Sequence, residues 1–131
     1  MTRILYIDDD EMMQKIYKAR LEADGCEVVA AKSGVEGITA ITEGGFDFIL
    51  IDHVLPDMTG VDVLHAIKEK AILGGAIPVM LTASGQERDA EEALAAGAAA
   101  FYSKDKVSPR DMLGELLRLK EQKNNNPSAV I

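Results

Sequence analysis

The sequence predicts a three-layer, doubly wound α/β fold with a five-stranded parallel sheet, and three observations support this prediction. Short apolar runs alternate with segments of helical periodicity from one end of the chain to the other. The run at residues 48–51 is apolar throughout, as expected for a central parallel strand covered on both faces. The chain has no internal repeat, and connections between parallel strands are short and right-handed. Successive strand–helix units therefore build one sheet with helices on both faces.

The first part of the chain contains two of these units. Residues 4–7 and 28–30 are the strands. Between them, apolar residues recur at helical spacing until Gly25, which is a natural helix stop. The second helix begins at Ser33, because Ser33 and the Glu36 three residues later form the pattern of a capping box.

The third unit lies at the centre of the chain. Its strand, residues 48–51, is followed by a turn-rich stretch over residues 56–60. A helix with apolar residues at helical spacing comes next. We expect the pair Gly74–Gly75 to end this helix.

The last two units complete the domain. The fourth strand ends at Thr82, and the helix after it is rich in Ala and Glu and closes at Gly97. A fifth strand leads to a final helix that starts at Ser108, with Pro109 at its first position. We predict that residues 1–121 form one domain and that the Asn-rich residues 122–131 are a disordered tail or the start of a linker.

The composition excludes several classes of protein. A formal net charge of −8 argues against a nucleic-acid-binding surface, which needs a basic stripe to neutralise phosphates. The single Cys26 rules out an internal disulfide and a cysteine metal site. The N-terminal apolar stretch is too short for a signal peptide, and no apolar run approaches the roughly 20 residues of a membrane span. We therefore expect a cytoplasmic domain with neither nucleic-acid nor membrane partners.

Acidic residues stand directly behind two of the predicted strands. Asp8, Asp9 and Asp10 follow the first strand, and Asp52 follows the third. Ligand crevices in open α/β sheets form at the carboxyl ends of the strands, so these acids are expected to meet there. We expect Asp10 to cap the first helix and to stay outside the chemistry.

The fourth and fifth strands bring a hydroxyl and an ammonium to the same edge, since they lead into Thr82 and Lys104. Acids gathered without a counter-charge repel one another, and a bound divalent cation removes that penalty. A few carboxylates with open positions suit Mg²⁺, which keeps several waters and often binds through carboxylates and phosphate. The sequence therefore predicts a site for a divalent cation and a phosphoryl group.

Four motifs carry a resemblance to a known family. They are Ile-Leu-Tyr-Ile-Asp-Asp-Asp at 4–10, Phe-Ile-Leu-Ile-Asp-His-Val-Leu-Pro-Asp-Met-Thr-Gly at 48–60, Pro-Val-Met-Leu-Thr-Ala at 78–83 and Phe-Tyr-Ser-Lys at 101–104. In this order and at these spacings, the chain resembles a response-regulator receiver domain of two-component signalling over roughly residues 3–120. The resemblance implies a flavodoxin-like fold. It also implies that the chain is a signalling domain and not an enzyme.

The resemblance also implies a phosphoacceptor and a metal site. Asp52 would take a phosphoryl group from a sensor histidine kinase or a phosphotransfer protein, its carboxylate attacking phosphorus. Asp9, Asp52 and the backbone carbonyl of Val54 would ligate Mg²⁺ or Mn²⁺. Asp8 would act through a coordinated water.

A second group of residues would respond to phosphorylation of Asp52. The resemblance implies that Thr82, Ala83 and Lys104 bind the phosphoryl oxygens. Phe101 would then rotate into the space that Thr82 vacates, while Tyr102 faces the other way. The surface formed by the fourth helix, fifth strand and fifth helix would change shape and regulate a downstream protein or a covalently linked effector domain. A phosphorylation-dependent dimer is a further possibility.

Three positions depart from the family pattern or tune it. Asp105 follows Lys104 where the family usually has a cis proline; a cis bond before Asp costs roughly 3 kcal/mol, so the sequence leaves this turn open. Lys106 is the alternative to Lys104 as the functional lysine. Val54 and Ser84 flank the path of a hydrolytic water, and the apolar Val54 cannot orient it. We therefore expect slow autodephosphorylation.

Two other functions remain open at this point. A haloacid-dehalogenase-like phosphohydrolase also has an Asp-x-Asp pattern behind its first strand, and Asp8 rather than Asp52 would then take the phosphoryl group. The chain lacks the cap insertion and the small-residue continuation of that family. A degenerate receiver would be a binding module that is never phosphorylated. Either a single-domain regulator or the receiver part of a longer protein fits the sequence.

Overall fold

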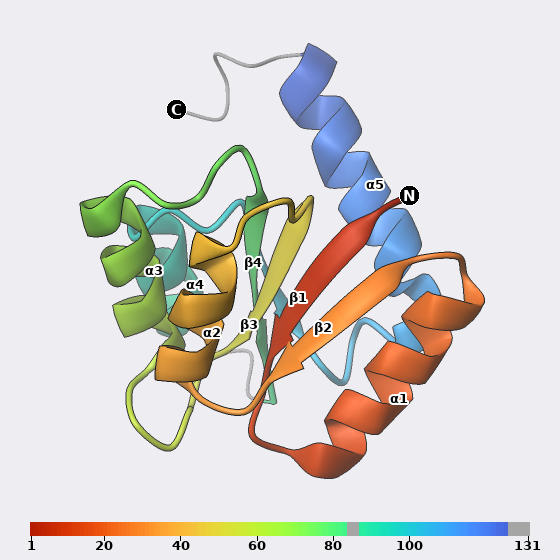
Figure 1. Ribbon diagram of the computed structural model, residues 1–131, viewed down its shortest axis with the longest axis horizontal. Coiled ribbons are helices and arrows are strands. Elements are labelled where there is room, and N and C mark those ends of the chain that lie inside the picture. Colours follow the sequence, from red (N-terminus) through yellow and green to blue (C-terminus); the bar gives the residue numbers. More distant parts are fainter. Residues whose placement is uncertain (84–86, 126–131) are drawn as a thin grey trace.

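The computed structural model, which describes residues 1–83 and 87–125, is a three-layer α/β structure (Figure 1). Its sheet has five strands in the order β2-β1-β3-β4-β5, and every neighbouring pair is parallel. This confirms the predicted fold class. Among the described helices, none has the length and apolar character needed to cross a bilayer.

The elements alternate along the chain as the sequence predicts. The strands are β1 (Arg3–Ile7), β2 (Glu27–Ala31), β3 (Phe48–Asp52), β4 (Ile77–Thr82) and β5 (Ala100–Ser103). The helices are α1 (Glu11–Ala23), α2 (Gly34–Thr42), α3 (Gly60–Lys70), α4 (Glu87–Ala95) and α5 (Pro109–Asn125).

Two apolar clusters, one on each face of the sheet, form the core. Helices α1 and α5 cover one face, and α2, α3 and α4 cover the other (Figure 1). Because side chains of a strand alternate between faces, Leu50 of β3 packs in the α1–α5 cluster, whereas Ile49 and Ile51 pack in the α2–α4 cluster. The central strand therefore needs apolar residues at every position before Asp52.

The helix starts are capped largely as the sequence predicts. The Asp10 carboxylate accepts hydrogen bonds from the amides of Met12 and Met13, so Asp10 is the N-cap of α1. Ser33 caps α2 by accepting from the amide of Glu36. The second half of the predicted capping box is wrong, however.

The Glu36 carboxylate accepts from the amide of Lys32 at 2.7 Å, one residue before the N-cap. The first amides of α2 are instead satisfied from a distant loop, because the Asp57 carboxylate accepts from Gly34 and Val35 at 2.8 and 3.0 Å. The capping oxygen therefore comes from the segment that follows β3, and no local pattern encodes it.

Two helix ends differ from the prediction. Helix α3 stops at Lys70, before the Gly74–Gly75 pair, because Ala71 takes a left-handed conformation with φ 54°. Helix α5 runs to Asn125, beyond the predicted end at residue 121, since the intervening residues include neither Gly nor Pro. Residues 126–131 of the predicted tail lie outside the described part of the chain.

The left-handed cap of α3 makes a prediction about stability. Ala71 is exposed and pays the steric cost of a positive φ, which glycine avoids. We expect Ala71→Gly to raise the free energy of unfolding by about 0.5–1 kcal/mol, measured by urea denaturation. The matched control is Ala66→Gly inside α3, which should lower it by a similar amount. Destabilisation by Ala71→Gly would contradict this account of the cap.

Candidate functional site

Three carboxylates meet at the carboxyl ends of β1 and β3. The two strands are paired with Ile7 opposite Ile51, so the acids that follow them are neighbours. Carboxylate oxygens of Asp8, Asp9 and Asp52 lie within 4.8 Å of one another, and we call these three residues the acidic site. The convergence expected from the sequence is thus present. A cluster of three oxygen donors at this spacing fits a hard divalent cation.

Asp8 is the most tightly held member of the acidic site. Its side chain is fully buried, and its Oδ2 accepts from the Tyr6 hydroxyl at 2.7 Å and from Lys104 Nζ at 2.8 Å. Its Oδ1 accepts from the amide of Asp10 at 3.0 Å. Burial by itself raises the pKa of Asp8, but the hydrogen bonds from Lys104, Tyr6 and the Asp10 amide outweigh burial and lower this pKa below its ordinary value.

Asp52 lies in a less favourable electrostatic environment. Its side chain is 13% exposed and 3.6 Å from Lys104 Nζ, and its Oδ1 accepts from the amide of His53 at 2.9 Å. Burial, reinforced by the negative charge of Asp8, raises the pKa of Asp52 to about 7, against the opposing effect of Lys104. Asp9 is exposed, so the acidic site opens to solvent on its side.

The ends of β4 and β5 deliver the other predicted groups. Thr82 is buried, and the amide of Lys104 donates to its carbonyl at 2.7 Å, which ties the two strand ends together. Ala83 is exposed. Lys104 reaches both Asp8 and Asp52, whereas Lys106 is exposed, so the geometry favours Lys104 as the functional lysine.

The turn after Lys104 uses a polar contact in place of the family's proline. The described residues contain no cis peptide bond, so the Lys104–Asp105 bond is trans. The Asp105 carboxylate accepts a hydrogen bond from the Ser103 hydroxyl, and this bond lowers the pKa of Asp105. The amides of Lys106 and Val107 both donate to the Ser103 carbonyl. Ser103 and Asp105 together therefore hold the turn that carries Lys104.

The loop after β3 approaches the acidic site closely. Val54 pairs with Thr59 in an isolated antiparallel bridge, and its side chain is 69% exposed. The hydrogen bonds of this bridge are accepted by the carbonyls of His53 and Met58, so they leave the Val54 carbonyl out. A Cβ at position 60 would lie 2.5 Å from the Asp52 carbonyl, so Gly60 is required for this approach. Ser84 lies outside the described residues.

The two aromatic residues of β5 point to opposite faces, as predicted. Phe101 packs against the α2–α4 cluster and Tyr102 against the α1–α5 cluster. The Tyr102 hydroxyl donates to Glu115 of α5 at 3.2 Å. Phe101 therefore lies on the side of the sheet that α4 covers.

Two residues in contact with the acidic site were not predicted. Tyr6 donates to Asp8, and Gln14 Nε2 donates to the carbonyls of Asp8 and Ala31 at 2.5 and 2.8 Å. Both had a signal in the sequence. Tyr6 is two residues before Asp8 and so shares its face of the strand. Gln14 is a polar residue at helical spacing from Tyr17, on the buried stripe of α1.

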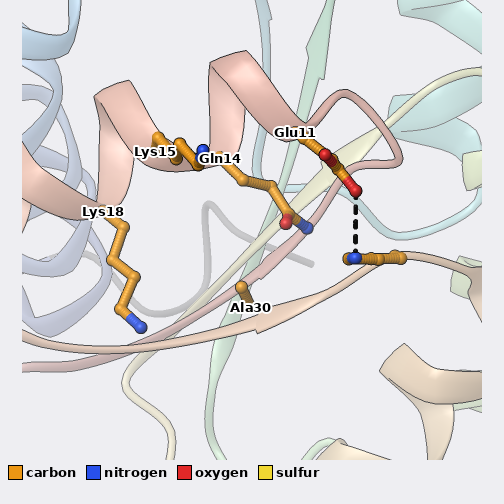
Figure 2. A pocket seen from close by; sticks show the side chains of 6 residues that line it. Glu11, Gln14, Lys15, Lys18 and Ala30 are labelled. Carbon is orange, nitrogen blue, oxygen red and sulfur yellow. Dashed lines mark hydrogen bonds and ion pairs between the residues drawn. The ribbon is translucent and has the colours of Figure 1, made fainter.

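Gln14 also lines a cavity of about 330 Å³ between α1 and β2 (Figure 2). The other lining residues are Glu11, Lys15, Lys18, Ala30 and Lys32. Two of these lining residues, Glu11 and Lys32, form an exposed ion pair of 3.2 Å. None of the three acids lines this cavity, so it is distinct from the acidic site.

The raised pKa of Asp52 predicts a pH effect on stability in the absence of metal. Between its ordinary value of 3.8 and about 7, the folded protein keeps a proton on Asp52 that the unfolded chain has lost, so stability falls as pH rises. Asp52→Asn removes the titrating carboxylate and therefore removes this decrease in stability at higher pH. Its stabilising effect should be roughly 2–3 kcal/mol larger at pH 7.5 than at pH 5, in urea unfolding with a chelator present.

The control for this experiment is Glu22→Gln, which removes one exposed carboxylate from α1. Because charges at an exposed position are screened by solvent, the stability change of this variant should vary less with pH than that of Asp52→Asn. If Asp52→Asn and Glu22→Gln gave the same pH profile, the electrostatic description of Asp52 would be wrong.

Two response regulators are similar to this chain in sequence. At 32% identity, the transcriptional regulatory protein ResD of Bacillus subtilis aligns over 86% of the chain, which spans only 45% of ResD. The polar-differentiation response regulator DivK of Brucella ovis is 29% identical, over 82% of the chain and 87% of DivK.

Solved structures show the same fold. A CheY-like receiver domain protein from Methanospirillum hungatei is 34% identical and superposes with a TM-score of 0.83, covering 96% of this chain and 99% of that one. Chemotaxis protein CheY4 of Vibrio cholerae is 27% identical with a TM-score of 0.83, over 91% and 98% of the two chains. The model of the response regulator receiver domain matches residues 4–116. The chain therefore belongs to the receiver domain family of two-component response regulators.

Proposed function

We propose that the chain is a phosphoacceptor domain in which Asp52 receives a phosphoryl group from a histidine kinase or a phosphotransfer protein. One observation carries this proposal. The Asp52 carboxylate lies within 4.8 Å of two other carboxylates and 3.6 Å from the Lys104 ammonium. A nucleophile, candidate metal ligands and a phosphate-binding cation are therefore in one place, as phosphoryl transfer requires.

The reaction forms one bond and breaks one. A carboxylate oxygen of Asp52 attacks phosphorus, and the bond from phosphorus to the donor's imidazole nitrogen breaks in line with the attack. The imidazole leaves with the electron pair, and the product is an acyl phosphate on Asp52. Lys104 neutralises charge on the phosphoryl oxygens, and Thr82 and Ala83 line the same edge of the sheet.

A divalent cation fits the same residues. Asp9 and Asp52 would be its carboxylate ligands, with the Val54 carbonyl as a third. Both oxygens of Asp8 already accept hydrogen bonds from Tyr6, Lys104 and Asp10, which favours a water-mediated role for Asp8. When bound, Mg²⁺ or Mn²⁺ supplies charge neutralisation for the phosphoryl oxygens.

The output is a change of shape on the surface formed by α4, β5 and α5. Phosphoryl oxygens on Asp52 would attract Thr82, and Phe101 would turn further inward. The two arrangements are alternative states whose populations the modification shifts. The altered surface would regulate a downstream protein or a linked effector domain, with dimerisation as one form of that output.

Phosphate labelling tests the assignment of the acceptor. With acetyl phosphate and Mg²⁺, we expect the wild-type chain to gain one phosphoryl group, detected by intact-mass spectrometry. Asp52→Asn should abolish the labelling. Labelling that instead disappears in Asp8→Asn but persists in Asp52→Asn would indicate phosphohydrolase chemistry, and no labelling of the wild type would indicate a binding module.

The lifetime of the acyl phosphate tests the role of Val54. An apolar side chain cannot orient a hydrolytic water, so Val54→Asn should speed loss of phosphate by at least about threefold. Val54→Leu keeps the position apolar and should leave the rate nearly unchanged. The rates are measured from the decay of the labelled species after the donor is removed. A rate for Val54→Asn at or below that of the wild type would refute the proposed role.

A further inference from the structure

One oxygen of Asp8 has two hydrogen-bond donors that differ in mobility. Asp8 Oδ2 accepts from the Tyr6 hydroxyl at 2.7 Å and from Lys104 Nζ at 2.8 Å. Asp8 and Tyr6 are both fully buried. A buried carboxylate that loses a donor pays the desolvation cost of an unsatisfied charge. The free-energy cost of moving Lys104 away from Asp8 therefore depends on how many donors remain on this oxygen.

Tyr6 is the immobile donor of the two. Its ring packs in the α1–α5 cluster and meets Tyr17 edge-on, with the ring centroids 5.3 Å apart and the planes at 82°. The Tyr17 hydroxyl donates in turn to the Val107 carbonyl at 3.2 Å, in the segment that follows Lys104. These contacts fix the direction of the Tyr6 hydroxyl toward Asp8.

Lys104 is the mobile donor. Its ammonium lies 2.8 Å from Asp8 and 3.6 Å from Asp52, on a flexible four-carbon stem. A phosphoryl group on Asp52 would bring new anionic oxygens close to this ammonium. Lys104 would then shift from Asp8 toward those oxygens.

We propose that Tyr6 is a positioning residue of the phosphoryl site, because its hydroxyl keeps Asp8 Oδ2 hydrogen-bonded when Lys104 leaves for the phosphoryl oxygens. This inference rests on the proposed phosphoacceptor function. Tyr6 thereby lowers the cost of releasing the lysine and holds Asp8 in one orientation. The alternative is that Tyr6 has only a packing role, in which its ring fills the core as an apolar group and its hydroxyl does not matter.

Removal of the hydroxyl alone separates these two roles. In Tyr6→Phe the ring remains, and we expect beryllofluoride, a phosphoryl mimic, to bind about tenfold more weakly in saturating Mg²⁺, measured by calorimetry. Tyr102→Phe is the matched control, since it removes a tyrosine hydroxyl that donates to Glu115 of α5 and not to the acidic site, and binding should stay within about twofold of the wild type. Equal affinities for wild type and Tyr6→Phe would overturn the proposal.

A second experiment needs neither metal nor phosphate. In Lys104→Met, Asp8 Oδ2 keeps only the Tyr6 donor, so adding Tyr6→Phe should lower the urea midpoint more than it does in the wild-type background. Equal decreases in both backgrounds would overturn the proposal. In the wild-type chain, we expect the buried Tyr6 hydroxyl proton to exchange slowly enough to be seen by NMR and to remain visible after beryllofluoride binds. Its loss on binding would also overturn the proposal.

The two proposals fail in different ways. If the wild-type chain does not bind beryllofluoride, the phosphoacceptor function is wrong, whatever the urea experiment shows. If the wild type binds and Asp52→Asn does not, but Tyr6→Phe binds normally, only the role of Tyr6 is wrong.

Discussion

The ion pair between Lys104 and Asp8 offsets the repulsion among the carboxylates of the acidic site, which lie at the ends of two different strands. Parallel strands bring three carboxylates within 4.8 Å of one another, an arrangement that like-charge repulsion opposes. A single ammonium, 2.8 Å from Asp8 and 3.6 Å from Asp52, offsets charge that comes from two strands. Because the Lys104 amide is bonded to the Thr82 carbonyl, the same contact connects β4 and β5 to the acids of β1 and β3.

Asp8 and Asp52 differ in their hydrogen bonds and in the direction of their pKa shifts. Asp8 has donors on both oxygens and a lowered pKa, so its charge is already stabilised within the protein. Asp52 has fewer donors and a raised pKa, so its charge is the one that a cation or a covalent bond to phosphorus relieves. Both residues stand at the ends of neighbouring parallel strands, but hydrogen bonds outweigh burial at Asp8, whereas burial and the negative charge of Asp8 dominate at Asp52. This difference supports Asp52, rather than Asp8, as the nucleophile of the proposed function.

The loop after β3 is fastened at both ends around the acidic site. Asp57 caps the N-terminus of α2, and Thr59 with Asp62 forms a reciprocal capping box at the start of α3. Toward α4, on the same face of the sheet, His53 Nε2 lies 3.8 Å from a carboxylate oxygen of Asp89. The segment that would supply the Val54 carbonyl is thus connected to three helices. Such connections limit how far this loop moves when the site is modified.

The sequence by itself determined the order and type of the elements, the parallel sheet, the Asp10 cap and the meeting of Asp8, Asp9, Asp52 and Lys104. Those features follow from periodicity and from the rule that parallel strand ends converge. Only the tertiary structure decided the Tyr6 bond to Asp8, the Asp57 cap of α2, the early end of α3 and the length of α5. The spacing of apolar residues predicts which face of a helix or strand is buried. The partner of a buried polar atom depends instead on residues that can be distant in sequence. Gln14 Nε2, for example, donates to the Ala31 carbonyl 17 positions away, so folding alone selects this partner.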